Sequence, residues 1–192
     1  MEKKTFLIAG LGNPGEKYSK TRHNVGFSFI EELADEYNIS LSKQKFSAEY
    51  GKGKIDGYDV LLVKPLSFMN LSGEPVQKIT NFFNIQTENV IIVHDDLDIE
   101  IGRVKIKEKG GHGGHNGIRS LISHIGNDFT RVRIGIGRPD GKGDVSDFVL
   151  GKFKKSDKDL ITDIITITKD AVVTIIKDGT ANAMNRFNQS VK

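Results

Sequence analysis

The sequence contains no cysteine, no long apolar run and no large excess of charge of either sign. Without cysteine among its 192 residues, the chain has neither disulfides nor a thiolate that could act as nucleophile or metal ligand. Because disulfides are rare in reducing compartments, this absence is consistent with a cytoplasmic location. Every apolar run is far shorter than the roughly 18 residues of a membrane span, and the segment before Phe6 is too short for a signal peptide. We therefore expect a single soluble domain over residues 1–192 that makes no membrane contact.

The net charge of +3 is unevenly distributed along the chain. Residues 102–155 contain 12 Lys and Arg against 5 Asp and Glu, whereas the rest of the chain contains 16 against 20. One region is therefore basic within an otherwise mildly acidic protein. This asymmetry suits a surface that faces a polyanion, although scattered solvated lysines would give the same count.

Strand-like and helix-like segments are interspersed along the chain. The Asp-Gly pair at 56–57 predicts a tight hairpin, so the sheet is expected to be mixed rather than purely parallel. Apolar spacing predicts a helix that begins near Asn24, a weaker one around residues 76–83, and a long one after Ser156. Gly179 is expected to end the long helix just before a short final one. The pattern predicts a single-domain α/β fold with a twisted mixed β-sheet surrounded by α-helices. The expected strands are Thr5–Ala9, Phe46–Ile55, Tyr58–Val63, Val90–His94, Arg103–Lys107 and Thr130–Ile136.

The glycines after the first expected strand match the spacing Gly-x-Gly-x-x-Gly of a dinucleotide-binding loop. That function requires a helix to begin inside the motif and an acidic residue at the end of a second strand about 20 residues on. Neither feature is present, and the Lys-Ser/Thr of a P-loop is missing too, so we expect no nucleotide cofactor. The loop instead forms a sharp turn at the carboxyl end of a strand, where it presents Asn13, Tyr18 and His23.

Polar side chains also follow other expected strands. The stretches concerned are KPLSFMNLSG (64–73), VIIVHDDLD (90–98) and KGGHGGHNG (109–117). If these polar side chains lie close together in the fold, two kinds of chemistry are compatible with them. One is activation of water by a neutral histidine that a carboxylate orients. The other is metal-dependent hydrolysis with His94, Asp95, His112 and His115 as ligands, although His-Gly-Gly-His matches no common ligand spacing.

Two expected strands carry cations at every second position. Lys105 and Lys107 alternate with aliphatic residues, and so do Arg131 and Arg133. Alternation of this kind places the cations on the exposed face of each strand, although any half-exposed strand alternates in the same way. Two such strands beside the glycine–histidine loop suit a phosphate backbone. The segment Gly135–Lys155, rich in Gly and Asp, is expected to be a long functional loop.

A series of short motifs occurs in one order along nearly the whole chain, from Phe6 to about Phe187. Through them the chain resembles the bacterial-type peptidyl-tRNA hydrolases. The motifs are Gly-Leu-Gly-Asn13-Pro-Gly, Tyr18 with Thr-Arg-His23-Asn-Val-Gly, Phe68-Met-Asn70-Leu-Ser-Gly, His94-Asp95-Asp-Leu-Asp, Gly-Gly-His-Gly-Gly-His-Asn116-Gly, Arg-Val-Arg133-Ile-Gly-Ile-Gly-Arg-Pro and Asp147-Phe-Val-Leu-Gly-Lys.

The resemblance implies hydrolysis of the ester between an N-blocked peptide and the 3′-terminal ribose of tRNA, which recycles tRNA from aborted translation. It assigns His23 as the base that takes a proton from water, Asp95 as the group that orients it, and Asn13 to discrimination of N-blocked substrates. It implies no cofactor and no metal, and it suggests a monomer. Residues that match contacts to the tRNA end or its peptide are Tyr18, Phe68, Met69, Asn70 and Asn116, and those expected near tRNA phosphates are Lys105, Lys107 and Arg133.

Two alternatives stay open at this stage. A non-catalytic RNA-binding protein of the same fold would explain the basic region, but it would have no use for the set Asn13, His23 and Asp95. A metal-dependent hydrolase would lose its activity to a chelator. The sequence itself departs from the family pattern only at Asp96, where many relatives carry Glu.

Overall fold

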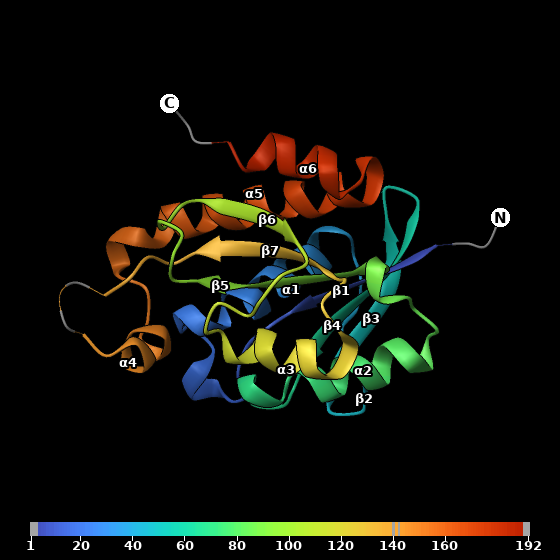
Figure 1. Cartoon of the computed structure of the whole chain (residues 1–192), viewed down its shortest axis with the longest axis horizontal. Coiled ribbons are helices and arrows are strands. Elements are labelled where there is room, and N and C mark those ends of the chain that lie inside the picture. Colours follow the sequence, from blue (N-terminus) through green and yellow to red (C-terminus); the bar gives the residue numbers. More distant parts are fainter. Residues whose placement is uncertain (1–3, 140, 142, 190–192) are drawn as a thin grey trace.

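Figure 1 shows a computed structural model of the chain, in which helices cover both faces of a central β-sheet. The structure describes residues 4–139, 141 and 143–189. These residues form the single-domain α/β fold with a mixed sheet that the sequence predicts. The expected domain limits at residues 1 and 192, and positions 140 and 142 of the expected 135–155 loop, lie outside the described residues.

The sheet has the strand order β2-β3-β4-β1-β5-β7-β6. β1 pairs in parallel with β4 on one side and β5 on the other, and β5 pairs in parallel with β7. The remaining pairings, β2 with β3, β3 with β4 and β6 with β7, are antiparallel. The carboxyl ends of the four parallel strands therefore meet along one edge, where ligands bind in such sheets. The strands are β1 (Thr5–Gly10), β2 (Lys43–Lys45), β3 (Ala48–Ile55), β4 (Tyr58–Pro65), β5 (Val90–Asp96), β6 (Val104–Glu108) and β7 (Thr130–Gly135).

Helices pack on the two faces of the sheet in two layers. Along β1, alternate side chains enter different cores: Ile8 packs with α1, α5 and α6, whereas Leu7 and Ala9 pack with α2 and α3. This alternation follows from the period of two in a strand. None of the helices in the described part of the chain is both long and apolar enough to cross a membrane. The helices are α1 (Val25–Glu36), α2 (Gly73–Phe82), α3 (Asn116–Ile125), α4 (Val145–Leu150), α5 (Lys158–Asp178) and α6 (Thr180–Phe187).

The glycine motif after β1 serves packing, because α1 crosses it at contact distance. A Cβ atom on Gly10 would lie 2.0 Å from the carbonyl oxygen of Gly26 in α1, and one on Gly12 would lie 2.6 Å from the ring of Phe27. Neither approach is possible for a residue with a side chain. The sequence argument against a dinucleotide loop thus has a structural explanation: these glycines bring the start of α1, and His23 just before it, against the end of β1.

The outer edge of the sheet at β6 is closed by a side chain from the C-terminal region. Asn188, which directly follows α6, accepts a hydrogen bond from the backbone N–H of Ile106 through Oδ1 at 2.7 Å. Its Nδ2 donates to the carbonyl oxygen of the same residue at 2.8 Å. The amide thus pairs with β6 much as a neighbouring strand would.

The structure corrects two expectations about secondary structure. The strand expected from Phe46 begins at Ala48, because Phe46 and Ser47 form the turn after β2 with φ of +52° and +55°. The 135–155 segment is also not wholly a loop, since it contains α4. Asp144 caps the N-terminus of this helix, because its side chain accepts hydrogen bonds from two backbone N–H groups. A six-residue helix lacks the length to show a clear periodic pattern in the sequence.

Candidate active site

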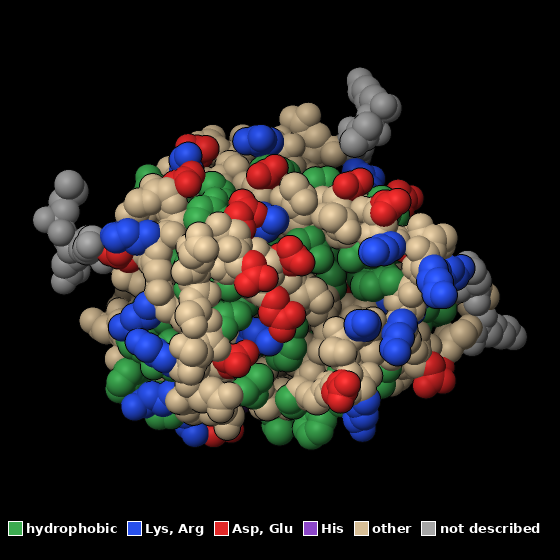
Figure 2. Space-filling view, turned by 180° about the vertical axis from the view of Figure 1, so that it is seen from behind, with side chains coloured by type: hydrophobic (Ala, Val, Ile, Leu, Met, Phe, Trp, Pro, Cys, Tyr) green, Lys and Arg blue, Asp and Glu red, His purple; other side chains and the backbone are tan. Residues whose placement is uncertain are grey.

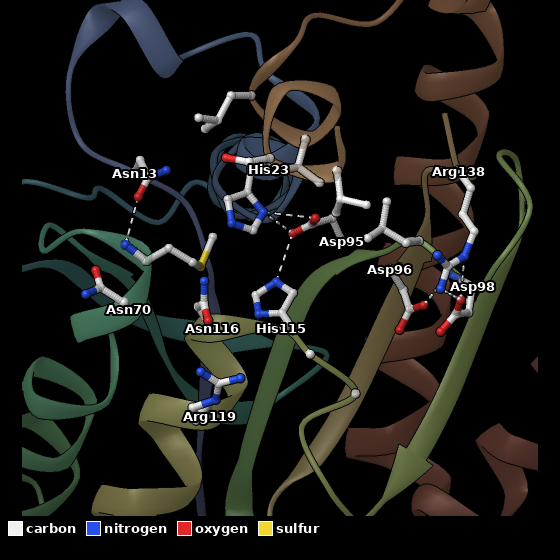
Figure 3. Close-up of a pocket in the computed structure, with 18 of the residues that line it drawn as sticks. Asn13, His23, Asn70, Asp95, Asp96, Asp98, His115, Asn116, Arg119 and Arg138 are labelled. Atoms are coloured by element: carbon white, nitrogen blue, oxygen red, sulfur yellow. Dashed lines mark hydrogen bonds and ion pairs between the residues drawn. The ribbon is translucent and has the colours of Figure 1, made fainter. Parts of the chain in front are cut away.

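A cleft of about 800 Å³ opens at the carboxyl ends of β1, β4 and β5 (Figure 3). The loops after β1 and β4 supply one wall, β5 and α3 supply the floor, and α4 supplies residues on the remaining side. The predicted site residues that line the cleft are Asn13, His23, Phe68, Met69, Asn70, Asp95 and Asn116. Those that do not line it are Tyr18, Lys105, Lys107 and Arg133.

The carboxylate of Asp95 holds two histidine rings in the floor of the cleft. His23 Nδ1 lies 2.9 Å from each carboxylate oxygen, and His115 Nε2 lies 3.0 Å from Oδ1 (Figure 3). Asp95 is 2% exposed, so water hardly competes for these contacts. Because an ionised carboxylate only accepts hydrogen bonds, both ring nitrogens that face it must carry a proton.

His115 is fixed as a neutral ring by a second set of contacts. It stands directly before α3, and its Nδ1 accepts hydrogen bonds from the backbone N–H groups of Gly117 and Ile118 at 3.1 and 3.2 Å. A nitrogen that accepts cannot carry a proton, so the proton of His115 lies on Nε2, toward Asp95. One histidine therefore caps a helix and orients the carboxylate.

The electrostatics of the site keep Asp95 ionised. Burial alone would raise the pKa of the Asp95 carboxyl group. Favourable electrostatic interactions and hydrogen bonds with His23 and His115 outweigh that effect and hold the pKa of Asp95 well below its usual range. Asp95 is therefore a carboxylate at neutral pH, and His23 Nε2 is left free of it to accept a proton.

His94, whose ring packs against His115, is a buried histidine with no role in the cleft. The two ring centroids lie 4.7 Å apart, and His94 Nδ1 donates to the backbone carbonyl of Asp95 at 2.7 Å. Its Nε2 is buried and has no hydrogen-bond partner among the described residues. Burial, together with the neighbouring His115, lowers the pKa of His94 well below its usual value, so the ring stays neutral.

Asn13 is held by reciprocal hydrogen bonds that leave its amide nitrogen facing the cleft. Its backbone N–H donates to Asn24 Oδ1, and Asn24 Nδ2 donates to its carbonyl oxygen, both at 2.9 Å. The side-chain Oδ1 accepts from the backbone N–H of Met69 at 2.7 Å. In Figure 3 the Nδ2 group points away from that contact, toward the side where His23 lies. Met69 itself is buried.

Exposed groups at the mouth of the cleft are free to meet a ligand. Phe68 is 53% exposed, and the ring of Tyr18 stands edge-on to it with centroids 6.4 Å apart. The side-chain amides of Asn70 and Asn116 are exposed. Arg119 lies beside Asn116 in Figure 3 and has no ion pair with another described residue.

The predicted cations lie outside the cleft, and they differ in their surroundings. Lys107 is exposed and Lys105 half-buried, and neither forms an ion pair with another described residue. Arg133 Nε is hydrogen-bonded to Asp96 Oδ2 at 2.8 Å. Arg131, expected to be exposed, is 3% exposed, because the glycine loop covers it and accepts hydrogen bonds from it through two carbonyl groups.

The proposed metal ligands are not brought together as a set. His112 accepts a hydrogen bond from its own loop, at Gly114, and His94 faces the backbone of Asp95. The structure instead groups His23, Asp95 and His115, whose donor atoms lie within 4.8 Å of one another. In this group His23 Nδ1 and His115 Nε2 already form hydrogen bonds with the Asp95 carboxylate, whereas His23 Nε2 does not contact it.

Part of the cleft is not predicted from the sequence. The sequence suggests His115 only as a metal ligand, although its position directly before an expected helix also indicates a cap. Arg119 and the α4 residues Val145 and Val149 line the cleft but were not predicted. One signal for Arg119 was present, since it stands three positions after Asn116 on the same expected helix.

Comparison with known proteins places these motifs in one family. A family model described as peptidyl-tRNA hydrolase matches residues 7–192. The chain is 50% identical to a peptidyl-tRNA hydrolase of Clostridium novyi over 95% of its own length and 97% of that relative's. It is 45% identical to one of Clostridium botulinum over 95% and 96%. A crystal structure of the enzyme from Acinetobacter baumannii gives a TM-score of 0.91 at 43% identity, over 98% of this chain and 96% of the other.

The buried His94 should make the stability of the protein depend on pH. Its pKa is lowered in the fold, so below pH about 6.5, the ordinary histidine value, the unfolded state binds a proton that the folded state does not. The free energy of unfolding should therefore fall with decreasing pH, by up to about 1.4 kcal/mol per pH unit for one proton. We expect His94→Gln to flatten this slope in urea denaturation between about pH 6.5 and 5. The control His112→Gln, at a half-exposed ring, should keep it. Equal slopes for wild type and His94→Gln would contradict the assignment.

Proposed function

The chain belongs to the peptidyl-tRNA hydrolase family, and on that premise we propose that His23 is the general base of the reaction. The enzyme hydrolyses the ester that joins a peptide to the 3′-terminal ribose of tRNA. This activity sets aside the alternative of a non-catalytic RNA-binding protein. The observation that carries the proposal is the contact of His23 Nδ1 with both oxygens of a buried carboxylate.

That contact prepares His23 to accept a proton. With the proton of the neutral ring on Nδ1, the basic lone pair lies on Nε2, which Asp95 does not contact. When Nε2 is protonated, the ring becomes a cation beside a carboxylate that is already ionised, and the two charges attract each other in a site of low dielectric. The buried carboxylate thus favours the charged ring that forms in the transition state.

The reaction then needs two proton transfers. Water attacks the ester carbonyl carbon while its proton passes to His23 Nε2, which gives a tetrahedral oxyanion. The bond from that carbon to the ribose oxygen breaks, and His23 returns the proton to the leaving oxygen. The products are a peptide carboxylic acid and tRNA with a free 3′-terminal ribose.

The amide side chains around His23 suit the peptide part of the substrate. Asn13 Nδ2 is a donor of fixed direction, suited to a carbonyl group of an N-blocked peptide. Asn70 and Asn116 offer both donors and acceptors to backbone amides. A free aminoacyl group would instead bring an ammonium ion, whose desolvation is unfavourable without an acceptor. We assign discrimination of N-blocked substrates to Asn13 on this basis.

The surface outside the cleft suits the tRNA. The exposed ring of Phe68, supported by Tyr18, provides a face on which an unpaired terminal base can stack, worth about 1–3 kcal/mol. On the side of the molecule that faces away from the viewer in Figure 1, acidic side chains gather over the middle, where α1 lies (Figure 2). The exposed acids of α1 are Glu31, Glu32, Asp35 and Glu36. A polyanion should avoid that side and approach β6, which carries Lys105 and Lys107.

We further propose that the enzyme acts as a cytoplasmic monomer and needs no cofactor. The proposed base and the carboxylate that orients it come from the same chain, so the activation of water does not require a second copy. An ester requires only an activated water and stabilisation of the oxyanion.

Removal of the base tests this mechanism. We expect His23→Ala to lower kcat for N-acetyl-aminoacyl-tRNA by at least ~10²-fold, the usual effect of losing a general base, while the Kd for tRNA stays near that of wild type. The control His124→Ala removes a histidine outside the cleft and should leave both constants unchanged. If His23→Ala retains near-normal turnover, His23 is not the base.

Treatment with a chelator distinguishes water activation by His23 from metal-dependent catalysis. The grouping of His23, Asp95 and His115 makes metal-dependent catalysis the second candidate mechanism. We expect activity to survive dialysis against EDTA, and added zinc or manganese to give no increase, because a hydrogen-bonded histidine suffices to activate water. Loss of activity on dialysis and its recovery with one of these ions would instead establish these residues as ligands.

The salt dependence of substrate binding tests the phosphate contacts. Each cation that meets a phosphate contributes about 0.7–0.9 to the slope of log KM against log salt. We expect the double variant Lys105→Met, Lys107→Met to flatten this slope by up to ~2, and Arg133→Gln to change it by less, since Asp96 already shares its charge. The control Lys54→Met, Lys177→Met removes two lysines paired with acids at the β3–β4 hairpin and should keep the wild-type slope. Parallel slopes for the first double variant and wild type would exclude the phosphate assignment.

A further inference from the structure

Arg22, the residue before His23, joins two parts of the chain that are distant in sequence. It begins the 3₁₀ turn Arg22–Asn24 that leads into α1. Its Nη1 donates to the backbone carbonyl of Phe148 in α4 at 3.1 Å, and its guanidinium carbon lies 4.2 Å from the centre of the Phe148 ring. A planar guanidinium can donate and stack in this way at once.

Backbone contacts reinforce this connection. The N–H of Arg22 donates to the carbonyl of Gly151 at 2.9 Å, and Thr21 forms an antiparallel bridge with Lys152. Arg22 also packs closely against Gly151, since a Cβ atom there would lie 2.9 Å from Arg22 Nη1. The chain that follows α4 is thus bound along the segment that precedes His23.

α4 depends on these contacts for its position. It has six residues, none of them buried, and a helix this short is not stable in isolation. Among the described elements, the turn Arg22–Asn24 is the one against which α4 packs most closely. The opposite side of α4 faces the cleft, to which it contributes Val145, Ser146, Val149 and Leu150.

We propose that Arg22 is a positioning residue that docks α4 as a wall of the substrate cleft, a role that rests on the proposed function of that cleft. The same short turn then contains both the proposed base, His23, and Arg22, which holds α4 in place. His23 itself is held independently, by Asp95 and by the bonds between Asn24 and Asn13. Loss of the Arg22 side chain therefore impairs the binding of peptidyl-tRNA more than the chemical step.

The test compares Arg22→Met with Lys20→Met. Both variants remove one cation from the same loop, but Lys20 is exposed and makes no hydrogen bond or ion pair with another described residue. For Arg22→Met we expect KM for N-acetyl-aminoacyl-tRNA to rise by about tenfold, the effect of losing a charge-assisted hydrogen bond and a cation–π contact. The kcat should stay within about threefold, with the pH profile unshifted. Arg22→Lys keeps the charge without the planar fork and should fall between the two.

Hydrogen exchange supplies a readout independent of activity. In Arg22→Met, the amides of residues 145–151 should exchange at least ~10-fold faster than in wild type, while those of α1 stay unchanged. Phe148→Leu removes the ring and keeps the carbonyl. Combined with Arg22→Met, it should raise KM by less than the product of the two single effects, because both residues belong to one contact.

Three results would overturn the proposal. They are KM and exchange in Arg22→Met that match Lys20→Met, a fall in kcat at unchanged KM, and faster exchange spread over the whole chain. A failure of the proposed function looks different: His23→Ala would stay active, while the exchange of residues 145–151 would still report whether Arg22 holds α4.

Discussion

The active site depends on one buried carboxylate and the two imidazole rings that share it. Asp95 has almost no contact with water, and a charge in such a place is stable only when strong hydrogen bonds replace its hydration. His23 and His115 supply them, and they arrive from opposite directions along the chain. His23 comes from the turn after β1, and His115 comes from the start of α3. These hydrogen bonds therefore join three segments that are distant in the sequence, in addition to the catalytic role proposed for His23.

Each histidine is positioned by a different backbone feature. His115 is fixed because its second nitrogen caps α3, so its orientation follows from the direction of that helix. His23 is fixed because α1 packs against β1 without side chains between them at Gly10 and Gly26. A shift of either helix by a fraction of an ångström would lengthen a hydrogen bond to Asp95. The precise position of the proposed base thus depends on close packing between α1 and β1.

Most elements of the fold and many of the residues around the cleft could be predicted from the sequence, because both depend on local signals. Polar residues directly after apolar strands must gather at one edge of a parallel sheet, and Asn13, Asn70 and Asp95 do so. The incorrect predictions concern contacts between distant segments. Alternation placed Arg131 correctly on a face of β7, but it could not show that the glycine loop would cover that face. For the same reason, the sequence does not predict the pairing of Arg133 with Asp96 or the helix α4. Both are determined by the segments that pack against them.

The amide of Asn188 on the edge of β6 bears on the solubility of the protein. β6 presents lysines to the outside, and an outermost strand with open hydrogen-bonding groups invites another chain to extend the sheet. Asn188 occupies both backbone groups of Ile106, in the middle of this five-residue strand. Together with the mutual repulsion of the lysines, this leaves little edge on which a second molecule could build. The side chain that follows α6 thus limits the pairing of β6 with another molecule, and the outward faces of Lys105 and Lys107 remain uncovered by it.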